Sequence, residues 1–222
     1  MKPAFIFDMD GTLFQTDRIL EAALEDAFSQ LRNSGLWHSP TPIEKYRAIM
    51  GVPLPKVWET LLPEHPQMVR EETNAYFHAR LIWNIQNGKG ALYPNAEKLF
   101  GYLKDGGYPI FIASNGQNEY LKAIVDFYGL DQWVTETFSI EQIPTLDKRD
   151  LVKSIVEKHA ILEGAVIGDR LSDIQAAKAN GLTAIGCRFD FAQESELREA
   201  HFIVEDLQEI KGILPEIRKN IL

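Results

Sequence analysis

The sequence predicts an α/β fold, in which a parallel sheet carries helices on both faces and an all-helical segment is inserted near the start. Short apolar runs that end in polar residues or glycine alternate with longer helical patterns, which is typical of strand–helix units. From about residue 17 to about residue 86 the helical periodicity continues without a convincing strand. A chain of 222 residues is long enough for one large domain or two modest ones.

Three short apolar runs are the strongest strand candidates, because each of them ends in polar residues. They are residues 4–7 before Asp8, residues 108–113 before Ser114, and residues 165–167 before Gly168 and Asp169. Two weaker candidates follow, around residues 183–186 and 202–204. Since ligands bind outside the carboxyl ends of the strands in open α/β sheets, we expect the three polar clusters to converge on one crevice.

The inserted segment is recognised by its helical spacing and by the turn that follows it. Ile19, Ala23 and Ala27 recur at intervals of four, and glycine and proline residues interrupt the later pattern. An Asn-Gly-Lys-Gly stretch at residues 87–90 supplies a flexible turn before another helix begins near Pro94. The predicted domains are therefore an α/β core of residues 1–14 and 87–222, and an all-helical domain of residues 15–86.

Composition excludes several classes of protein. A net charge of −9 and an isoelectric point near 5.1 argue against sequence-independent binding to nucleic acid, which depends on cationic side chains. The single cysteine, Cys187, cannot form an intrachain disulfide, so we expect a reducing cytoplasm. No apolar stretch approaches the roughly 20 residues that span a bilayer, and the amino-terminal run is too short for a signal peptide, so neither secretion nor membrane insertion is expected.

The first candidate site is the Asp-x-Asp-Gly-Thr sequence that begins at Asp8. In an extended segment Asp8 and Asp10 point to the same side, and two carboxylates at the rim of a buried strand need a cation, a proton or hydrogen bonds to compensate them. The alternative is a solvated acidic turn, in which Gly11 turns the chain and Thr12 caps it.

The second and third clusters each have two interpretations as well. Ser114, Asn115 and the glycine after them precede a helical pattern, so they form either an anion site at a helix amino terminus or a simple N-cap. Asp169 and Asp173 are four residues apart and share one face if a helix begins there, but acids also suit the first turn of any helix.

Taken together, the three clusters favour a metal site. All of them follow predicted strands, and four carboxylates brought within a few ångströms are unstable without a divalent ion. An all-oxygen site suits Mg²⁺. The candidate metal ligands are Asp8, Asp10, Asp169 and Asp173.

The sequence resembles the haloacid dehalogenase-like hydrolases, and among them the phosphatases with a helical cap inserted after the first strand. Residues 8–13 are similar to the family's first motif, Ser114 to its second, Lys148 to its third and residues 168–173 to its fourth, in the same order. The resemblance implies a Rossmann-like core with residues 15–86 as the cap. For the third motif, Arg149 and Lys153 are substitutes, and a surface lysine that begins an amphipathic helix is the alternative interpretation of Lys148.

By this resemblance, the protein is a Mg²⁺-dependent phosphatase. Asp8 attacks phosphorus to form an aspartyl phosphate, and Asp10 donates a proton to the leaving alkoxide and then deprotonates the attacking water. Asp8, the backbone carbonyl of Asp10 and Asp169 hold the metal, and Asp173 orients the ligands. The residues that hold the phosphate are Gly11, Thr12, Ser114, Asn115 and Lys148.

Single residues separate this chain from its relatives. Asp10 favours phosphate esters over halides, because a halide leaving group needs no proton. Sugar-phosphate mutases carry a His where this chain has Leu20 and a cap Arg where it has Leu54, so phosphatase is favoured over mutase. A non-catalytic phosphate-binding module is the other alternative, although Asp8 and Asp10 are both present. We expect a small phosphorylated metabolite as substrate, with cap residues such as Gln15, Thr16, Arg47 and Lys56 as candidates for selecting it, and a monomer or homodimer.

Overall fold

The computed structural model describes residues 2–49, 52, 54–190 and 192–217. The chain divides into two compact units, one of residues 1–15 and 92–222 and the other of residues 16–91. The turn at residues 87–89 belongs to the second unit because it folds back onto the helix before it, with the Lys89 N–H donating to the Asn84 carbonyl at 3.0 Å.

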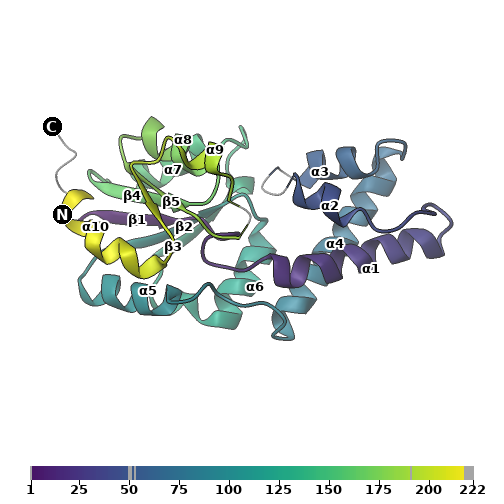
Figure 1. Ribbon diagram of the computed structural model, residues 1–222, viewed down its shortest axis with the longest axis horizontal. Coiled ribbons are helices and arrows are strands. Elements are labelled where there is room, and N and C mark those ends of the chain that lie inside the picture. Colours follow the sequence, from purple (N-terminus) through teal and green to yellow (C-terminus); the bar gives the residue numbers. More distant parts are fainter. Residues whose placement is uncertain (1, 50–51, 53, 191, 218–222) are drawn as a thin grey trace. The chain divides into compact units, whose positions relative to one another are not determined.

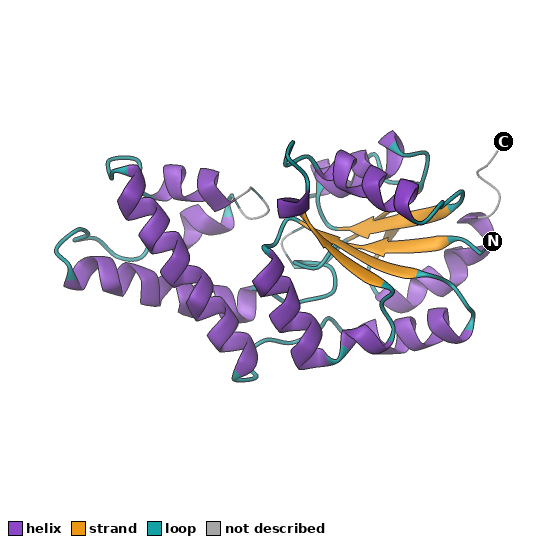
Figure 2. Ribbon diagram, turned by 180° about the vertical axis from the view of Figure 1, so that it is seen from behind, coloured by secondary structure: helices purple, strands orange, loops and turns teal. Residues whose placement is uncertain are grey.

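The first unit is built on a six-stranded parallel sheet with the strand order β3-β2-β1-β4-β5-β6 (Figures 1 and 2). The strands are β1 (Ala4–Phe7), β2 (Ile110–Ser114), β3 (Glu136–Ser139), β4 (Gly164–Gly168), β5 (Thr183–Cys187) and β6 (Phe202–Val204). Five of them lie where the apolar runs predicted strands. The sixth, β3, was missed because it is a half-buried edge strand that begins with the polar residues Glu136 and Thr137.

Helices cover both faces of this sheet, as Figures 1 and 2 show. On one face lie α5 (Ala96–Asp105), α6 (Asn118–Tyr128) and α10 (Ile210–Ile217), and on the other α7 (Lys148–Lys158), α8 (Leu171–Ala179) and α9 (Glu194–Leu197). Short 3-10 turns lie at Leu130–Gln132, Ile140–Gln142 and Leu207–Glu209. The predicted α/β fold with a doubly covered parallel sheet is therefore confirmed.

Side chains along the strands alternate between the two faces of the sheet, so each face has its own apolar layer. Ile6 of β1 packs in the cluster that contains Leu151 of α7 and Ile174 of α8, whereas Phe7 packs edge-on against Phe100 of α5 with ring centroids 5.1 Å apart. All four residues of β1 are buried. A strand that is buried on both faces reads as a continuous apolar run, which is why this one was easy to predict.

In the second unit, the regular secondary structure of the described residues is all helical, with α1 (Asp17–Asn33), α2 (Ile43–Arg47), α3 (Leu54–Leu61) and α4 (Gln67–Gln86). Its core is aromatic: Trp58 and Phe77 are buried with ring centroids 5.5 Å apart, and Phe28 lies 6.4 Å from Trp58. Arg80 of α4 pairs with Asp26 of α1 at 2.6 Å. These contacts give the unit its own hydrophobic core.

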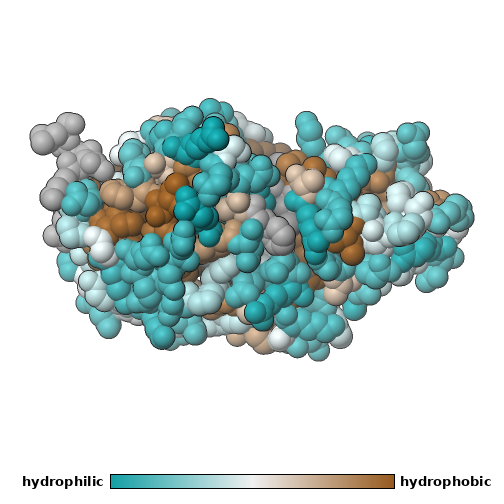
Figure 3. All heavy atoms as spheres, in the orientation of Figure 1, coloured by the Kyte–Doolittle hydropathy of each residue, from teal (hydrophilic) through white to brown (hydrophobic). Residues whose placement is uncertain are grey.

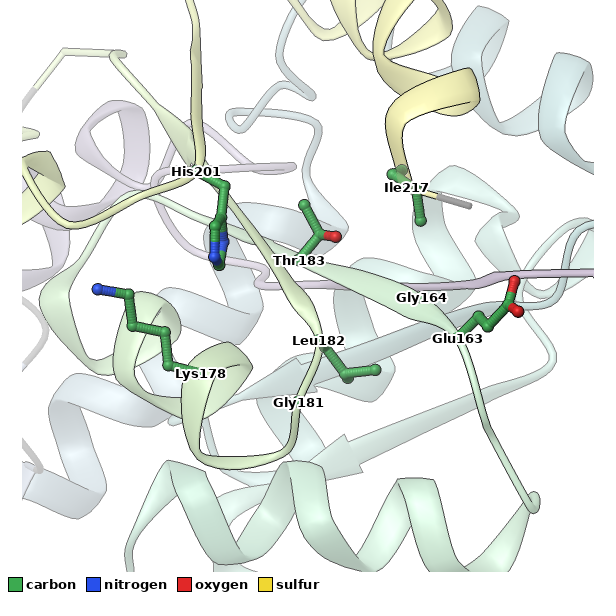
Figure 4. Close-up of a pocket in the computed structure, with 8 residues that line it drawn as sticks. All are labelled: Glu163, Gly164, Lys178, Gly181, Leu182, Thr183, His201 and Ile217. Atoms are coloured by element: carbon green, nitrogen blue, oxygen red, sulfur yellow. The ribbon is translucent and has the colours of Figure 1, made fainter. Parts of the chain in front are cut away.

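The surface in Figure 3 is mostly hydrophilic. None of the helices formed by the described residues combines the length and apolarity needed to cross a bilayer. At the amino ends of β4 and β5 lies a cavity of about 250 Å³, lined by Lys178, Gly181, Thr183 and His201 among others (Figure 4). This cavity lies at the amino edge of the sheet, whereas the polar clusters predicted from the sequence lie at the carboxyl edge.

Candidate active site

The parallel register brings the polar clusters together at the carboxyl edge of the three central strands. Phe7 of β1 is level with Ile112 of β2 and with Ile167 of β4. Asp8 directly follows β1, and Asp169 directly follows β4. Segments more than 100 residues apart in the sequence therefore supply one site.

Three buried carboxylates meet there. Asp8, Asp169 and Asp173 each offer an oxygen, and these oxygens all lie within 4.8 Å of one another. The spacing of Asp169 and Asp173 suggested one shared helical face if a helix began there. Helix α8 begins only at Leu171, so Asp169 lies before the helix and the two residues do not share a face of it. Asp173 lies in the first turn, where its Oδ2 accepts a hydrogen bond from the Arg170 N–H at 3.0 Å. The strand end places Asp169, and the helix cap places Asp173.

Lys148 supplies a buried positive charge to this cluster. Its Nζ lies 2.6 Å from Asp8 Oδ1 and also pairs with Asp173 Oδ1, and its side chain is only 3% exposed. The two alternatives considered for this position point elsewhere: Arg149 pairs with Asp147, and Lys153 lies 3.9 Å from Glu157. The surface-lysine interpretation of Lys148 is therefore wrong, although Lys148 does begin the helix α7.

Gly11 and Thr12 shape the turn that faces Asp169. Gly11 has a φ of +77°, and a Cβ atom built on it would lie 2.5 Å from Asp169 Oδ2, so a side chain would collide with that carboxylate. Thr12 is buried, and its hydroxyl donates to Asp169 Oδ1 at 3.0 Å. The turn of the first motif thus fixes the carboxylate of the fourth.

Ser114 is the last residue of β2 and is buried. Its Oγ accepts a hydrogen bond from the Gly116 N–H at 3.0 Å, and the Gly116 carbonyl accepts one from the Ser139 hydroxyl at 2.6 Å. The N-cap of α6 is Gln117, so Ser114 is not the helix cap that the simpler interpretation made it. Asn115 follows Ser114 and is half-buried. The loop before α6 is therefore held at both Ser114 and Ser139.

Sequence reasoning missed Tyr120 as a member of this site. It was placed in the apolar pattern of a helix, and it does lie on α6 and is buried, but its hydroxyl donates to Asp10 Oδ1 at 2.5 Å. Asp10 itself is half-buried. A signal was available, because a buried tyrosine hydroxyl usually finds a hydrogen-bond partner.

The electrostatics of the cluster favour a cation. Burial raises the pKa of Asp8 well above its usual range, Lys148 lowers it, and the neighbouring carboxylates Asp173 and Asp169 raise it further. Burial and Asp173 raise the pKa of Asp169 to about 7, although Arg170 opposes the shift. Burial disfavours the charge on Lys148, but Asp173 and Asp8 outweigh it and raise the pKa of that ammonium group.

Charge balance points the same way. Three carboxylates are buried here, and among the described residues they form ion pairs with Lys148 and Arg170. Arg170 lies 3.4 Å from Asp169 but is shared with Glu196 at 3.3 Å. The cluster therefore keeps excess negative charge, and its all-oxygen donor set fits a hard divalent cation such as Mg²⁺.

The residues suggested for substrate selection are less informative. Arg47 pairs with Glu44 at 2.6 Å and also with Glu21, so it is held within the helical unit, and Gln15 donates from Nε2 to the Leu92 carbonyl at 2.7 Å. Lys56 is exposed. Gly51 and Pro53, which precede the Leu54 position compared with the mutases, lie outside the described residues.

Comparison with known proteins agrees with this geometry. The family profile of the haloacid dehalogenase-like hydrolases matches residues 2–181. The chain belongs to this family. Its site carries an acidic cluster, a serine at the end of β2 and a buried lysine at the start of α7.

Its relatives within the family are phosphatases. The chain is 26% identical over 223 residues to the probable phosphatase IndB of Dickeya dadantii, covering 96% of this chain and 93% of that protein. It is also 26% identical over 228 residues to a phosphoglycolate phosphatase of Neisseria gonorrhoeae, covering 98% and 92%. A crystal structure described as a predicted phosphoglycolate phosphatase of Haemophilus somnus shares the fold, with a TM-score of 0.83 and 18% identity over 96% of this chain and 97% of that one. This haloacid dehalogenase-like hydrolase is therefore an enzyme of the phosphatase group.

Proposed function

We propose that this protein hydrolyses small phosphomonoesters with Mg²⁺, through an aspartyl phosphate formed on Asp8. One observation carries the proposal: three buried carboxylates lie within 4.8 Å of one another, with a buried lysine ammonium 2.6 Å from Asp8. Such a cluster is costly to bury unless it binds a cation and a ligand.

Asp8 is the proposed nucleophile because it combines burial with a cationic partner. The ammonium of Lys148 favours its carboxylate form against the desolvation that opposes it. In the first step an Asp8 oxygen forms a bond to phosphorus, and the bond from phosphorus to the ester oxygen breaks.

Asp10 is the proposed acid and base. It gives its proton to the departing alkoxide, which leaves as an alcohol. In the second step water attacks the phosphorus of the aspartyl phosphate and loses a proton to Asp10. The bond from phosphorus to the Asp8 oxygen breaks, inorganic phosphate is released, and both aspartates return to their starting forms.

Asp8 and Asp169 are the proposed side-chain ligands of the metal, together with the backbone carbonyl of Asp10. Mg²⁺, when bound, would neutralise charge on the phosphoryl oxygens. Asp173 is fully buried between the Lys148 ammonium and the Arg170 N–H, so we assign it the orientation of Lys148 and of the ligand cluster.

The remaining residues are assigned to the phosphate. Lys148 provides positive charge, and Ser114 and Asn115 provide a hydroxyl and an amide at the end of β2. Gly11 and Thr12 provide the backbone of the turn after Asp8, where only glycine fits beside Asp169.

The substrate is proposed only as a class. Phosphoglycolate is the first compound to test, because a relative that matches nearly the whole chain is named a phosphoglycolate phosphatase. Nucleoside monophosphates, pyrophosphate and small sugar phosphates complete the panel. We assign substrate selection to the inserted helical unit, by the family resemblance, and the protein to the cytoplasm, because its single cysteine is buried and free.

The test uses para-nitrophenyl phosphate with and without Mg²⁺. We expect turnover that needs the metal and stops with a chelator, and a loss of about 1000-fold or more in Asp8→Asn, since the nucleophile is removed. Asp105→Asn, a change of the same kind at an exposed position on α5, should keep wild-type rates. Absence of turnover by the wild type on this compound and on the panel, or unchanged turnover in Asp8→Asn, would favour the non-catalytic module.

A further inference from the structure

We propose that Tyr120 is a positioning residue that holds the carboxyl group of Asp10 for proton transfer; this rests on the proposed function. The Tyr120 hydroxyl donates to Asp10 Oδ1 at 2.5 Å, across 110 residues of sequence. None of the four sequence motifs contains Tyr120, and its aromatic ring alone would be explained by packing.

The position of Tyr120 makes its hydroxyl a rigid donor. It is 3% exposed and lies in the first turn of α6, directly after the Ser114 loop. A Cβ atom built on Gly116 would lie 3.1 Å from Tyr120 Cδ1, so the ring packs closely against that loop. The loop is itself held by the Ser139 hydroxyl. A tyrosine side chain has few rotatable bonds, so a ring packed on this side has little freedom to swing away from Asp10.

The hydrogen bond fixes which oxygen of Asp10 exchanges its proton. A carboxyl oxygen that accepts a hydrogen bond from a neighbouring O–H is the carbonyl oxygen of the protonated acid, so the proton lies on the other oxygen. With Oδ1 accepting from Tyr120, we assign the exchangeable proton of Asp10 to Oδ2. The same bond persists when Asp10 is a carboxylate, because Oδ1 is an acceptor in both forms.

Asp10 carries the group whose position decides the proposed proton transfer. It lies in a turn beyond the end of β1 and is only half-buried, in contrast to the fully enclosed Asp173. A general acid has to lie within hydrogen-bond reach of the leaving oxygen, and a small displacement is costly. Tyr120 thus links the loop that holds the phosphate to the group that protonates the leaving group.

The test is the Tyr120→Phe variant, measured on two substrates whose leaving groups differ strongly in their need for a proton. Para-nitrophenolate leaves readily without one, whereas the alkoxide of glycerol phosphate does not. The quantity to compare is kcat/KM, because it reports the steps up to the release of the first product and excludes the later attack of water. We expect about a 10-fold loss on glycerol phosphate, at the low end of what general acid catalysis contributes, and less than about a 3-fold loss on the aryl ester.

Two further variants separate positioning from damage to the fold. Tyr128→Phe removes a hydroxyl from the same helix at a half-buried residue that packs near Phe14, and it should leave both kcat/KM values unchanged. In an Asp10→Asn background, Tyr120→Phe should add less than about a 2-fold loss on glycerol phosphate, because residues that act through one another are not additive.

The outcomes are distinct. If wild type turns over neither of these substrates nor any compound of the panel, the proposed function fails, and the inference fails with it. If glycerol phosphate alone is not a substrate, a sugar phosphate of the panel that is turned over takes its place. If wild type is active but Tyr120→Phe lowers both kcat/KM values equally, or neither, the proposed function stands and the role of Tyr120 is refuted. A full 10-fold additional loss in the Asp10→Asn background would also refute it, since Tyr120 would then act independently of Asp10.

Discussion

The two edges of the sheet use the same pairing of lysine with carboxylate in opposite settings. At the carboxyl edge, Lys148 and Asp8 are 2.6 Å apart with side chains 3% and 9% exposed. Beside the cavity at the amino edge, Lys178 and Glu199 are 2.9 Å apart with side chains 40% and 63% exposed. Exposed pairs contribute little, whereas burying a charge costs several kcal/mol unless its partners are in place. Burying these charged side chains at the carboxyl edge therefore costs folding free energy, and the proposed binding of a metal and a phosphate gives a reason for that cost.

The sharpest test of this contrast removes the lysine at each edge. Lys148→Met leaves Asp8 and Asp173 buried without their cation, so we expect about 3 kcal/mol loss in the free energy of unfolding. Turnover of para-nitrophenyl phosphate should fall by about 10-fold or more, the loss from one electrostatic donor. Urea unfolding and steady-state kinetics measure the two effects.

Lys178→Met is the matched control at the amino edge. It should change the free energy of unfolding by less than about 0.5 kcal/mol and leave turnover unchanged, because its ion pair is exposed to water. Near-normal kinetics for Lys148→Met would contradict its assignment to the phosphate.

Two glycines extend the comparison from side-chain charge to backbone conformation. Gly11 at the carboxyl edge and Gly181 at the amino edge both have a positive φ, +77° and +67°. A Cβ atom on Gly181 would meet nothing within 4 Å, whereas one on Gly11 would collide with Asp169. Gly181→Ala should therefore cost about 1 kcal/mol, the backbone strain alone.

Gly11→Ala should cost about 2 kcal/mol more than Gly181→Ala, because overpacking adds to the same strain. It should also abolish most Mg²⁺-dependent turnover, since the displaced carboxylate of Asp169 is a proposed metal ligand. Thermal unfolding and kinetics on both variants provide the measurement. Equal destabilisation by the two substitutions would mean that the turn at Gly11 moves aside and does not fix Asp169.

Much of the carboxyl edge could be predicted from the sequence because its signals are local. A buried central strand is a continuous apolar run, so β1 and β4 and the polar residues after them were visible in the chain. Parallel strands then bring Asp8, Ser114 and Asp169 to one edge without any knowledge of long-range contacts.

The parts that could not be predicted depend on contacts between distant segments. The edge strand β3 has polar residues and one neighbouring strand, so its sequence carries no strong pattern. The spacing of Asp169 and Asp173 suggested one helical face, but the helix begins only after Asp169. The hydroxyl of Tyr120 finds Asp10 across the fold, and in the sequence it reads as one more apolar residue of a helix.

The last expected effect is a pH dependence of stability that arises at the carboxyl edge. In the metal-free protein the pKa of Asp169 is raised from 3.8 to about 7, mainly by burial and Asp173. The folded state therefore binds this proton more tightly than the unfolded state does. The stabilisation is complete below the unfolded pKa and is lost as pH rises through the folded one, at up to about 1.4 kcal/mol per pH unit. The raised pKa of Asp8 acts in the same direction.

Urea unfolding in a chelator between pH 5.5 and 8 measures this effect. The free energy of unfolding of the wild type should fall as pH rises, and that of Asp169→Asn should fall less, because its amide cannot titrate. Carboxylates with lowered pKa values, such as Glu25 and Glu136, lose their contribution only under more acidic conditions, and both proteins share them. Excess Mg²⁺ should oppose the fall in the wild type, since a dication takes over the compensation that the proton provides. If the free energy of unfolding changed equally with pH in the two proteins, the charge of Asp169 would already be neutralised by its protein neighbours without a metal. Burying that carboxylate would then cost little, which would contradict the contrast between the two edges.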